Sequence, residues 1–377
     1  MSESIQTKPF LAFLPNRDDM PTHEAVAQRV LAEQLAQLLG MGYIGDYPRD
    51  ADGELAYEAV GPCYLVPSDT IIGTEQAARL GIRGEDDLFG AVAPYAFLPT
   101  KAISHPLGHA GAEAPPGWST VFGERIGDAV LEGFSAFSIV DARGAGLALL
   151  ADGPLRIKPV LARGGLGQQV VRSADELELA LETLDAGALA LCGLVLERQL
   201  EQVRTFSVGQ VRVAGLLVSY VGEQHLTCDN QGREVYGGST LQLCRGGFAA
   251  LQQLPLSEEM RQAIHQAQTY DEAASACFPG LIASRRNYDV ALGTDPQGRS
   301  RSGVLEQSWR IGGASSAEVI ALQRFQAEPA LQRLRASSVE VYGQPPSLPA
   351  GALLIYQGTD PQSGPLTKYA RIEDAGE

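Results

Sequence analysis

Cysteine pairs are missing from this chain of 377 residues. Its five cysteines, at positions 63, 192, 228, 244 and 277, lie far apart and form no CxxC motif. An odd number of widely spaced cysteines argues against a disulfide framework and against a zinc site. We therefore expect a reducing compartment, with a cytoplasmic location as the default.

Long apolar runs and an excess of basic charge are also missing. No run approaches the roughly 18 apolar residues that a membrane span needs, and the first residues do not resemble a secretion signal. The net charge of −16 argues against nucleic acid, which proteins bind by neutralising phosphates with Lys and Arg. We expect neither a membrane nor a nucleic acid partner, whereas a nucleotide needs only local positive charge. The oligomeric state stays open, a homodimer included.

Lysine is scarce, since four lysines stand against twenty-five arginines. A lysine kept in that background indicates a contact that suits a compact charge, such as one with phosphate. Lys158 lies in the stretch RIKPVLARGGLG, just before Gly164, Gly165 and Gly167. Glycines allow main-chain N–H groups to approach an anion, although the same stretch can also be a plain hairpin turn.

The hydrophobic pattern predicts alternating strands and helices along most of the chain. The first hundred residues include an amphipathic helix from Thr22 that ends at Gly40. Serine and glutamate three residues apart suggest capping boxes at Ser173 and Ser315. The further expected elements are a buried strand at 191–200, an antiparallel hairpin at 205–221, a long helix from 257, two strands around the turn 294–298, a helix broken by the proline at 329, and a last strand at 352–358 with a polar tail.

Two acidic residues fall on the strands NYDV and VLEQSWR. Glu306, Ser308 and Arg310 are two residues apart, so they share one face of a strand, and Asp289 lies across the hairpin. Two carboxylates together with phosphate oxygens are ligands that Mg²⁺ commonly takes. The alternative is an exposed hairpin face with a salt bridge between Glu306 and Arg310. The small and apolar residues around these charges favour a lined site.

With these motifs in order, residues 120–325 resemble the ATP-grasp superfamily, which includes biotin carboxylase-like and D-alanine–D-alanine ligase-like enzymes. GPLRIKP resembles the strand whose lysine contacts phosphates, and RGGLG resembles the glycine loop that follows it. LVLERQL resembles the hinge strand between the subdomains, and VLEQSWR resembles the ExNxR strand. The resemblance implies an α/β (α+β) fold in which two α+β subdomains clamp ATP. The expected units are an N-terminal α/β domain at 1–107, a small or lid subdomain at 120–196, a large subdomain with the metal site at 197–340, and a C-terminal strand and tail at 341–377.

The resemblance also implies roles for single residues. Phosphates would be held by Lys158 and by a second cation, for which Arg125 and Lys101 are alternatives. Arg310 would face the transferred phosphate or a substrate carboxylate. The remaining roles are adenine pairing by the main chain of Glu197 and Leu200, ribose binding by Glu201, and Mg²⁺ (or Mn²⁺) binding by Asp289, Glu306 and Ser308, the last replacing the usual Asn.

A second substrate has weaker candidates. Ser239 and Arg245 lie in the glycine-flanked stretch YGGSTLQLCRGG, where Arg245 is a possible carboxylate clamp and an ordinary turn is equally open. His105 and His109 are four residues apart, which suits two metal ligands on a helix. Pro106 and Gly108 between them favour a solvated loop instead.

These features predict an ATP- and Mg²⁺-dependent ligase. It would form an acyl phosphate from a small-molecule carboxylate and join the acyl group to an amine or a thiol. The alternatives are a small-molecule kinase and a non-catalytic ATP-binding regulatory protein. The serine at position 308, in place of the usual Asn, favours the regulatory protein. The identity of the two substrates lies beyond the sequence, because a fold does not specify a substrate.

Overall fold

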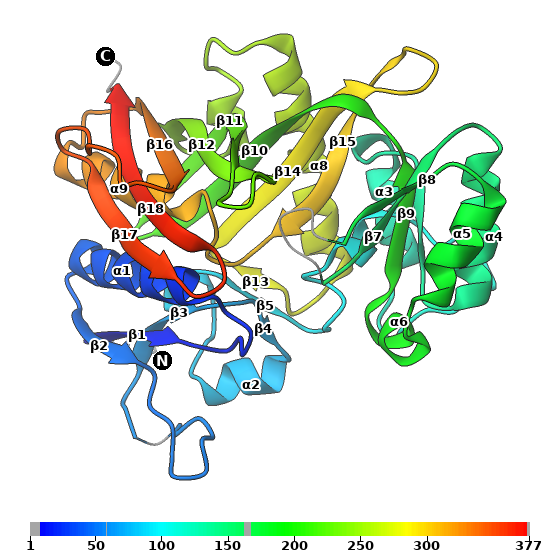
Figure 1. Cartoon of the computed structure of the whole chain (residues 1–377). Helices are drawn as coiled ribbons and strands as arrows, with labels where there is room; N and C mark the ends of the chain where they lie inside the picture. The colour runs from blue at the N-terminus through cyan, green and yellow to red at the C-terminus, as the bar shows by residue number, and fades with distance from the viewer. Residues whose placement is uncertain (1–7, 58, 162–166, 375–377) are drawn as a thin grey trace.

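The structure is a computed structural model that describes residues 8–57, 59–161 and 167–374. Within these ranges the chain forms four sheets, two of which are small and belong to the N-terminal part (Figure 1). None of the helices described is both long and apolar enough to cross a membrane. The mixed α/β class predicted from the sequence is confirmed.

The N-terminal part pairs strands in parallel and covers them with one long helix. Strand β1 (Phe10–Leu14) lies between β2 (Gly42–Asp46) and β3 (Cys63–Pro67). Helix α1 (Thr22–Leu39) ends, as predicted, at Gly40, whose φ of 66° is the left-handed conformation that glycine adopts without strain. The other elements are β4 (Ile71–Ile72), α2 (Thr74–Arg79), η1 (Glu85–Asp87), β5 (Ala91–Ala93), η2 (Lys101–Ser104), and β13 (Ile282–Ala283), which joins β5.

A four-stranded sheet follows, here called the small sheet, in the order β6 (Gly133–Ala136), β9 (Leu194–Arg198), β7 (Leu155–Pro159), β8 (Gln169–Val171). Helices α4 (Ile139–Leu150) and α5 (Ala174–Glu182) cover one face, where Leu155, Ile157 and Leu196 are buried. Strand alternation therefore turns Lys158 and Glu197 to the opposite face. Helix α6 (Ala186–Cys192) precedes β9, whereas α3 (Thr120–Ile126) and η3 (Gly127–Ala129) pack against the long helix at Glu258–Cys277.

The large sheet has eight strands. In Figure 1 it runs from β17 and β18 at the left of the view to β14 and β15 near the centre. Its order is β15 (Ser300–Ser308), β14 (Arg285–Thr294), β10 (Glu201–Val213), β11 (Leu216–Cys228), β12 (Glu234–Arg245), β16 (Arg333–Tyr342), β18 (Gly364–Asp374), β17 (Leu353–Asp360). Helix α8 (Glu258–Cys277) packs on one face with Tyr288 and Val290, and the short α7 (Phe248–Leu251) lies beside it. Helix α9 (Ser315–Ala327) packs on the other face at the β12–β16–β18 end, together with α1.

The local structure excludes one open alternative and corrects two sequence predictions. The stretch 236–247 is not a turn but most of β12, which pairs with β16 about a hundred residues later in the chain (Thr240 with Ser337). The polar tail is the strand β18, paired with both β16 and β17. Ser315 does not cap α9, because the N-cap residue is Ala314 and the Glu318 side chain is buried against Arg285.

Candidate active site

Two carboxylates face one another where β14 pairs with β15. Asp289 is opposite Glu306, as the sequence predicted, and a β-bulge at Leu305 inserts one extra residue between this pair and the next. The carboxylate of Asp289 accepts hydrogen bonds from Gln224 Nε2 (2.8 Å) and Asn287 Nδ2 (2.9 Å). Desolvation by the surrounding atoms and the nearby charge of Glu306 raise the pKa of Asp289 to about 6. The buried surroundings and the neighbouring carboxylate thus disfavour the charged form of Asp289.

A lysine from another part of the chain lies against this acidic pair. Lys101 Nζ is 2.8 Å from Glu306 Oε2, and its side chain is 8% exposed. It comes from η2, the short helix that contacts β15 on one side and β6 and β9 of the small sheet on the other. Arg125, the alternative cation, is exposed in the last turn of α3. Of the two alternatives, the structure brings only Lys101 to the acidic pair.

Lys158 lies on the face of the small sheet opposite α4 and α5, where it forms an ion pair with Glu197. His105, the residue after η2, is fully buried and places its Nε2 3.2 Å from the other oxygen of Glu197. Burial alone would raise the pKa of Glu197, but the charge of Lys158 and the contact with His105 lower it to about 2. The prediction of a solvated loop is therefore wrong for His105. His109 is exposed and contacts Asp141 at 3.0 Å.

The structure corrects the part assigned to Glu197. Its main chain is flanked by Gly133 of β6 and Arg156 of β7, so it lies inside the sheet rather than at an edge open to adenine. Its carboxylate, which the sequence analysis did not use, is what holds Lys158. Leu200 lies between β9 and β10, and Glu201 is exposed at the start of β10. Both stay predictions.

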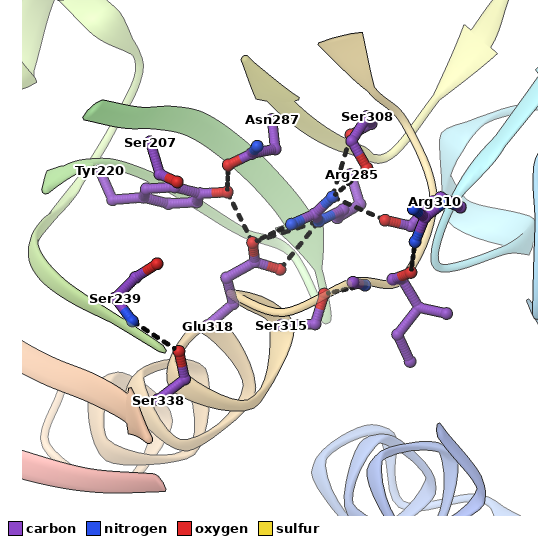
Figure 2. Close-up of polar contacts among 12 residues, drawn as sticks. Ser207, Tyr220, Ser239, Arg285, Asn287, Ser308, Arg310, Ser315, Glu318 and Ser338 are labelled. Carbon is purple, nitrogen blue, oxygen red and sulfur yellow. Dashed lines mark hydrogen bonds and ion pairs between the residues drawn. The ribbon is translucent and has the colours of Figure 1, made fainter. Parts of the chain in front are cut away.

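Ser308 is the last residue of β15 and Arg310 follows two residues later. The side chain of Arg285 binds the main chain of both residues. Arg285 Nη1 donates to the carbonyl oxygens of Ser308 (2.9 Å) and Arg310 (2.6 Å), while its other nitrogens pair with Glu318 (Figure 2). The Ser308 hydroxyl is 3.4 Å from the same guanidinium. The role of Ser308 as a metal ligand stays a prediction.

Sequence reasoning missed Arg285 and Asn287, although the pattern contained them. They precede Asp289 by four and two residues, so strand alternation puts all three on one face, while Tyr288 and Val290 point to α8. The signal was a run of polar residues at a spacing of two, starting in RRNYD.

Arg245 is not available as a carboxylate clamp. Its guanidinium donates to the main-chain oxygens of Phe325, Glu328 and Leu331, where α9 ends. Ser239 is buried on β12, with its hydroxyl 2.7 Å from that of Tyr236. Gly164 and Gly165 lie outside the described residues. Gly167 is described and has a φ of 69°, a conformation that favours glycine.

The oxygen atoms of the acidic pair, Asp289 and Glu306, are suitable ligands for a divalent cation. Both offer carboxylate oxygens, which are ligands that divalent cations such as Mg²⁺ take. In the described part of the chain, no three His, Cys, Asp or Glu residues group closely enough to hold a metal. A cation bound here would need ligands from a nucleotide or from water, which is usual for Mg²⁺.

Comparison with known proteins identifies the family. A family model described as "Protein of unknown function (DUF3182)" matches residues 11–370. The chain belongs to the DUF3182 family. No curated protein matches this DUF3182 chain in sequence.

Solved structures show what fold this DUF3182 protein has. N5-carboxyaminoimidazole synthetase from Staphylococcus aureus, complexed with ADP, superposes with a TM-score of 0.57 at 12% identity, covering 97% of this chain and 94% of the other. The biotin carboxylase domain of 2-oxoglutarate carboxylase from Hydrogenobacter thermophilus has a TM-score of 0.52 at 14% identity, covering 97% and 86%. Biotin carboxylase from Campylobacter jejuni has a TM-score of 0.51 at 13% identity, covering 97% and 87%. The predicted ATP-grasp fold is confirmed.

Proposed function

We propose that this DUF3182 protein is an ATP- and Mg²⁺-dependent ligase that activates a small-molecule carboxylate as an acyl phosphate and transfers it to an amine or a thiol. The observation that carries the proposal is the meeting of Asp289, Glu306 and Lys101. Lys158 is joined to the other end of the same segment, because Glu197 binds both Lys158 and His105. ADP complexes of the Staphylococcus aureus synthetase and the Hydrogenobacter thermophilus domain support nucleotide binding in this fold.

Each charged residue has a role in the proposal. Lys101 and Lys158 bind phosphate oxygens of ATP, together with the loop that contains Gly164, Gly165 and Gly167. Asp289 and Glu306 hold Mg²⁺, which neutralises phosphate charge when it is bound. Arg310 faces the transferred phosphate, and Leu200 and Glu201 bind the adenosine part.

The reaction uses two displacements. A carboxylate oxygen of the substrate attacks the terminal phosphorus, the bond to the bridging oxygen breaks, and ADP leaves with that electron pair. The nitrogen or sulfur nucleophile then attacks the acyl carbon, inorganic phosphate leaves, and the nucleophile gives up a proton. Lys101, Lys158 and Arg310 stabilise charge on the phosphate oxygens, which is the main task of a protein in phosphoryl transfer.

Product analysis tests this mechanism. Incubation with ATP, Mg²⁺, hydroxylamine and a panel of carboxylates should give ADP together with a hydroxamate. A stable phosphoester without a hydroxamate would identify a kinase, and AMP as the main product would exclude the acyl-phosphate route. Liquid chromatography of the nucleotides and mass spectrometry of the acid products separate these results.

A non-catalytic ATP-binding protein is the second candidate, and one contact favours it. Ser308 replaces the expected Asn ligand and lies beside the Arg285 guanidinium. Such a protein would bind MgATP in a titration yet release no ADP across a broad panel of acids and amines.

The two candidate phosphate cations predict different results. Because Lys101 is buried at the acidic pair, Lys101→Met should weaken MgATP binding by about tenfold or more, equal to about 1.4 kcal/mol. Arg125→Met is the matched control and should leave the affinity unchanged, because Arg125 is exposed on α3. Isothermal titration of both variants would show the opposite order if Arg125 were the phosphate contact.

A further inference from the structure

A fully buried ion pair lies behind the candidate active site. Arg285 is 1% exposed and Glu318 is 0% exposed. Arg285 Nη2 lies 2.7 Å from Glu318 Oε1, and Arg285 Nε lies 3.1 Å from each carboxylate oxygen. Two charges buried together are often no more stable than two apolar side chains of similar volume. Stability alone therefore does not account for this pair.

The pair supports the end of β15 on one side. Arg285 Nη1 donates to the carbonyl oxygens of Ser308 and Arg310, which are two residues apart. A planar guanidinium can bond a carboxylate and two carbonyl oxygens at once, which an ammonium group cannot do in one fixed geometry. The main chain that carries Arg310 is thus fixed to Glu318 through Arg285.

On the other side, the pair connects to the acidic residues. Glu318 Oε1 accepts from the Tyr220 hydroxyl at 2.6 Å, and that hydroxyl lies 2.9 Å from Asn287 Oδ1 (Figure 2). Asn287 Nδ2 in turn donates to Asp289 Oδ1. One continuous chain of buried contacts therefore joins Asp289 to the main chain of Arg310.

Local sequence makes this network possible. Tyr220 on β11 reaches across β10 because the facing residue there is Gly209, where a Cβ would lie 2.2 Å from the tyrosine oxygen. Helix α9 brings Glu318 in its first turn over the same face of the sheet. Gly209 on β10 therefore makes room for the Tyr220 side chain, and α9 places Glu318 within reach of its hydroxyl.

We propose that Arg285 is a positioning residue, which together with Glu318 fixes Arg310 for recognition of the terminal phosphate of ATP. This inference rests on the proposed function, in which Arg310 faces that phosphate. Arg285 touches no substrate itself. Its loss should affect the preference for ATP over ADP, whereas damage to the fold would weaken both nucleotides alike.

The test measures the dissociation constants of MgATP and MgADP by isothermal titration. The variant Arg285→Met/Glu318→Leu removes both charges, so no charge is left buried without a partner. The control is Arg286→Met/Asp271→Leu, which removes the ion pair (3.1 Å) between Arg286, on the opposite face of β14, and Asp271 of α8. Arg310→Ala measures how much of the preference for MgATP over MgADP is lost when the Arg310 side chain itself is removed.

We expect the first variant to melt near the wild-type temperature and to lose about tenfold in its preference for ATP over ADP. The control should keep the wild-type preference. Adding Arg310→Ala to the first variant should cause little further loss, because both changes remove the same interaction. An unchanged preference in the folded variant, or in Arg310→Ala, overturns the inference.

Arg285→Lys provides a second test if the double variant does not fold. It keeps a positive charge opposite Glu318 but cannot hold the carboxylate and both carbonyl oxygens together, so it should fold and still lose the preference. A wild-type preference in Arg285→Lys overturns the inference on its own. If the wild-type protein binds neither nucleotide, the proposed function fails and this inference fails with it.

Discussion

Replacing Lys158 by alanine is expected to reduce MgATP affinity by at least about tenfold, or about 1.4 kcal/mol. The same change leaves Glu197 buried without its lysine, and removing one partner of a buried pair typically costs roughly 3–5 kcal/mol of folding free energy. Titration calorimetry measures the first effect, and urea unfolding measures the second. Unchanged nucleotide affinity in a folded Lys158→Ala protein would remove Lys158 from the site.

Two controls separate binding from stability. Lys158→Met/Glu197→Gln removes both charges, so it should recover much of the lost stability while still binding MgATP weakly. Lys8→Ala removes a lysine of the N-terminal part that pairs with Asp87 at 2.7 Å, and it should leave the nucleotide affinity unchanged. Recovery of both properties by the double variant would mean that Lys158 is only structural.

The cost of losing Lys158 should depend on pH. The pKa of Glu197 is lowered in the folded protein from 4.5 to about 2, although burial opposes this change, because Lys158 and His105 favour the charged form. Its contribution to stability is therefore present above pH 4.5 and is lost as the pH falls toward 2. The stability difference between wild type and Lys158→Ala should shrink in that range.

Asp289→Asn and Glu306→Gln should each reduce Mg²⁺-dependent turnover by at least about a hundredfold, because each removes a charge that the proposed reaction uses. Asp289→Asn should leave the fold intact, whereas Glu306→Gln removes the charge that pairs with the buried Lys101 and should also lower stability. The pKa of Asp289 is raised from 3.8 to about 6 by desolvation and by Glu306. Its ionised form therefore costs stability, increasingly as the pH rises from 3.8 through 6.

Asp289→Asn should accordingly melt at a higher temperature than the wild type at pH 8 without Mg²⁺, with a smaller gain at pH 5. Asp295→Asn is a useful control, because Asp295 lies in the turn of the same hairpin. Desolvation opposes its charged form, but hydrogen bonds from Arg299 and Arg301 lower its pKa to about 2. It should lose rather than gain stability. Wild-type ATP turnover in both acid variants would show that Asp289 and Glu306 are ordinary hairpin charges.

The sequence predicted the parts of the site that depend on local spacing. Strand alternation and the turn between the two strands were enough to place Asp289 opposite Glu306. The β-bulge at Leu305 was not predictable, because it depends on how β15 pairs with its neighbour. The order of motifs also indicated the ATP-grasp fold, which the structure confirms.

Contacts between distant segments could not be predicted in this way. The Ser315–Glu318 pattern suggested a helix cap. The Glu318 carboxylate instead forms an ion pair with the buried Arg285, which lies 33 residues earlier in the chain. The glycines of β12 suggested a turn, because the strand that completes it, β16, comes much later in the chain. The contacts of Lys101 and His105 were not predictable either, because their acidic partners, Glu306 and Glu197, lie far along the chain on two different sheets.

The short segment 101–105 has a mechanical consequence. Lys101 at its start bonds Glu306 of the large sheet, and His105 at its end bonds Glu197 of the small sheet. A hinge motion that separates the two sheets must break one of these two end contacts, so that the segment stays with one sheet only. Opening therefore has an enthalpic barrier that a simple loop would not impose, and exchange of a bound molecule between the sheets should slow steeply on cooling.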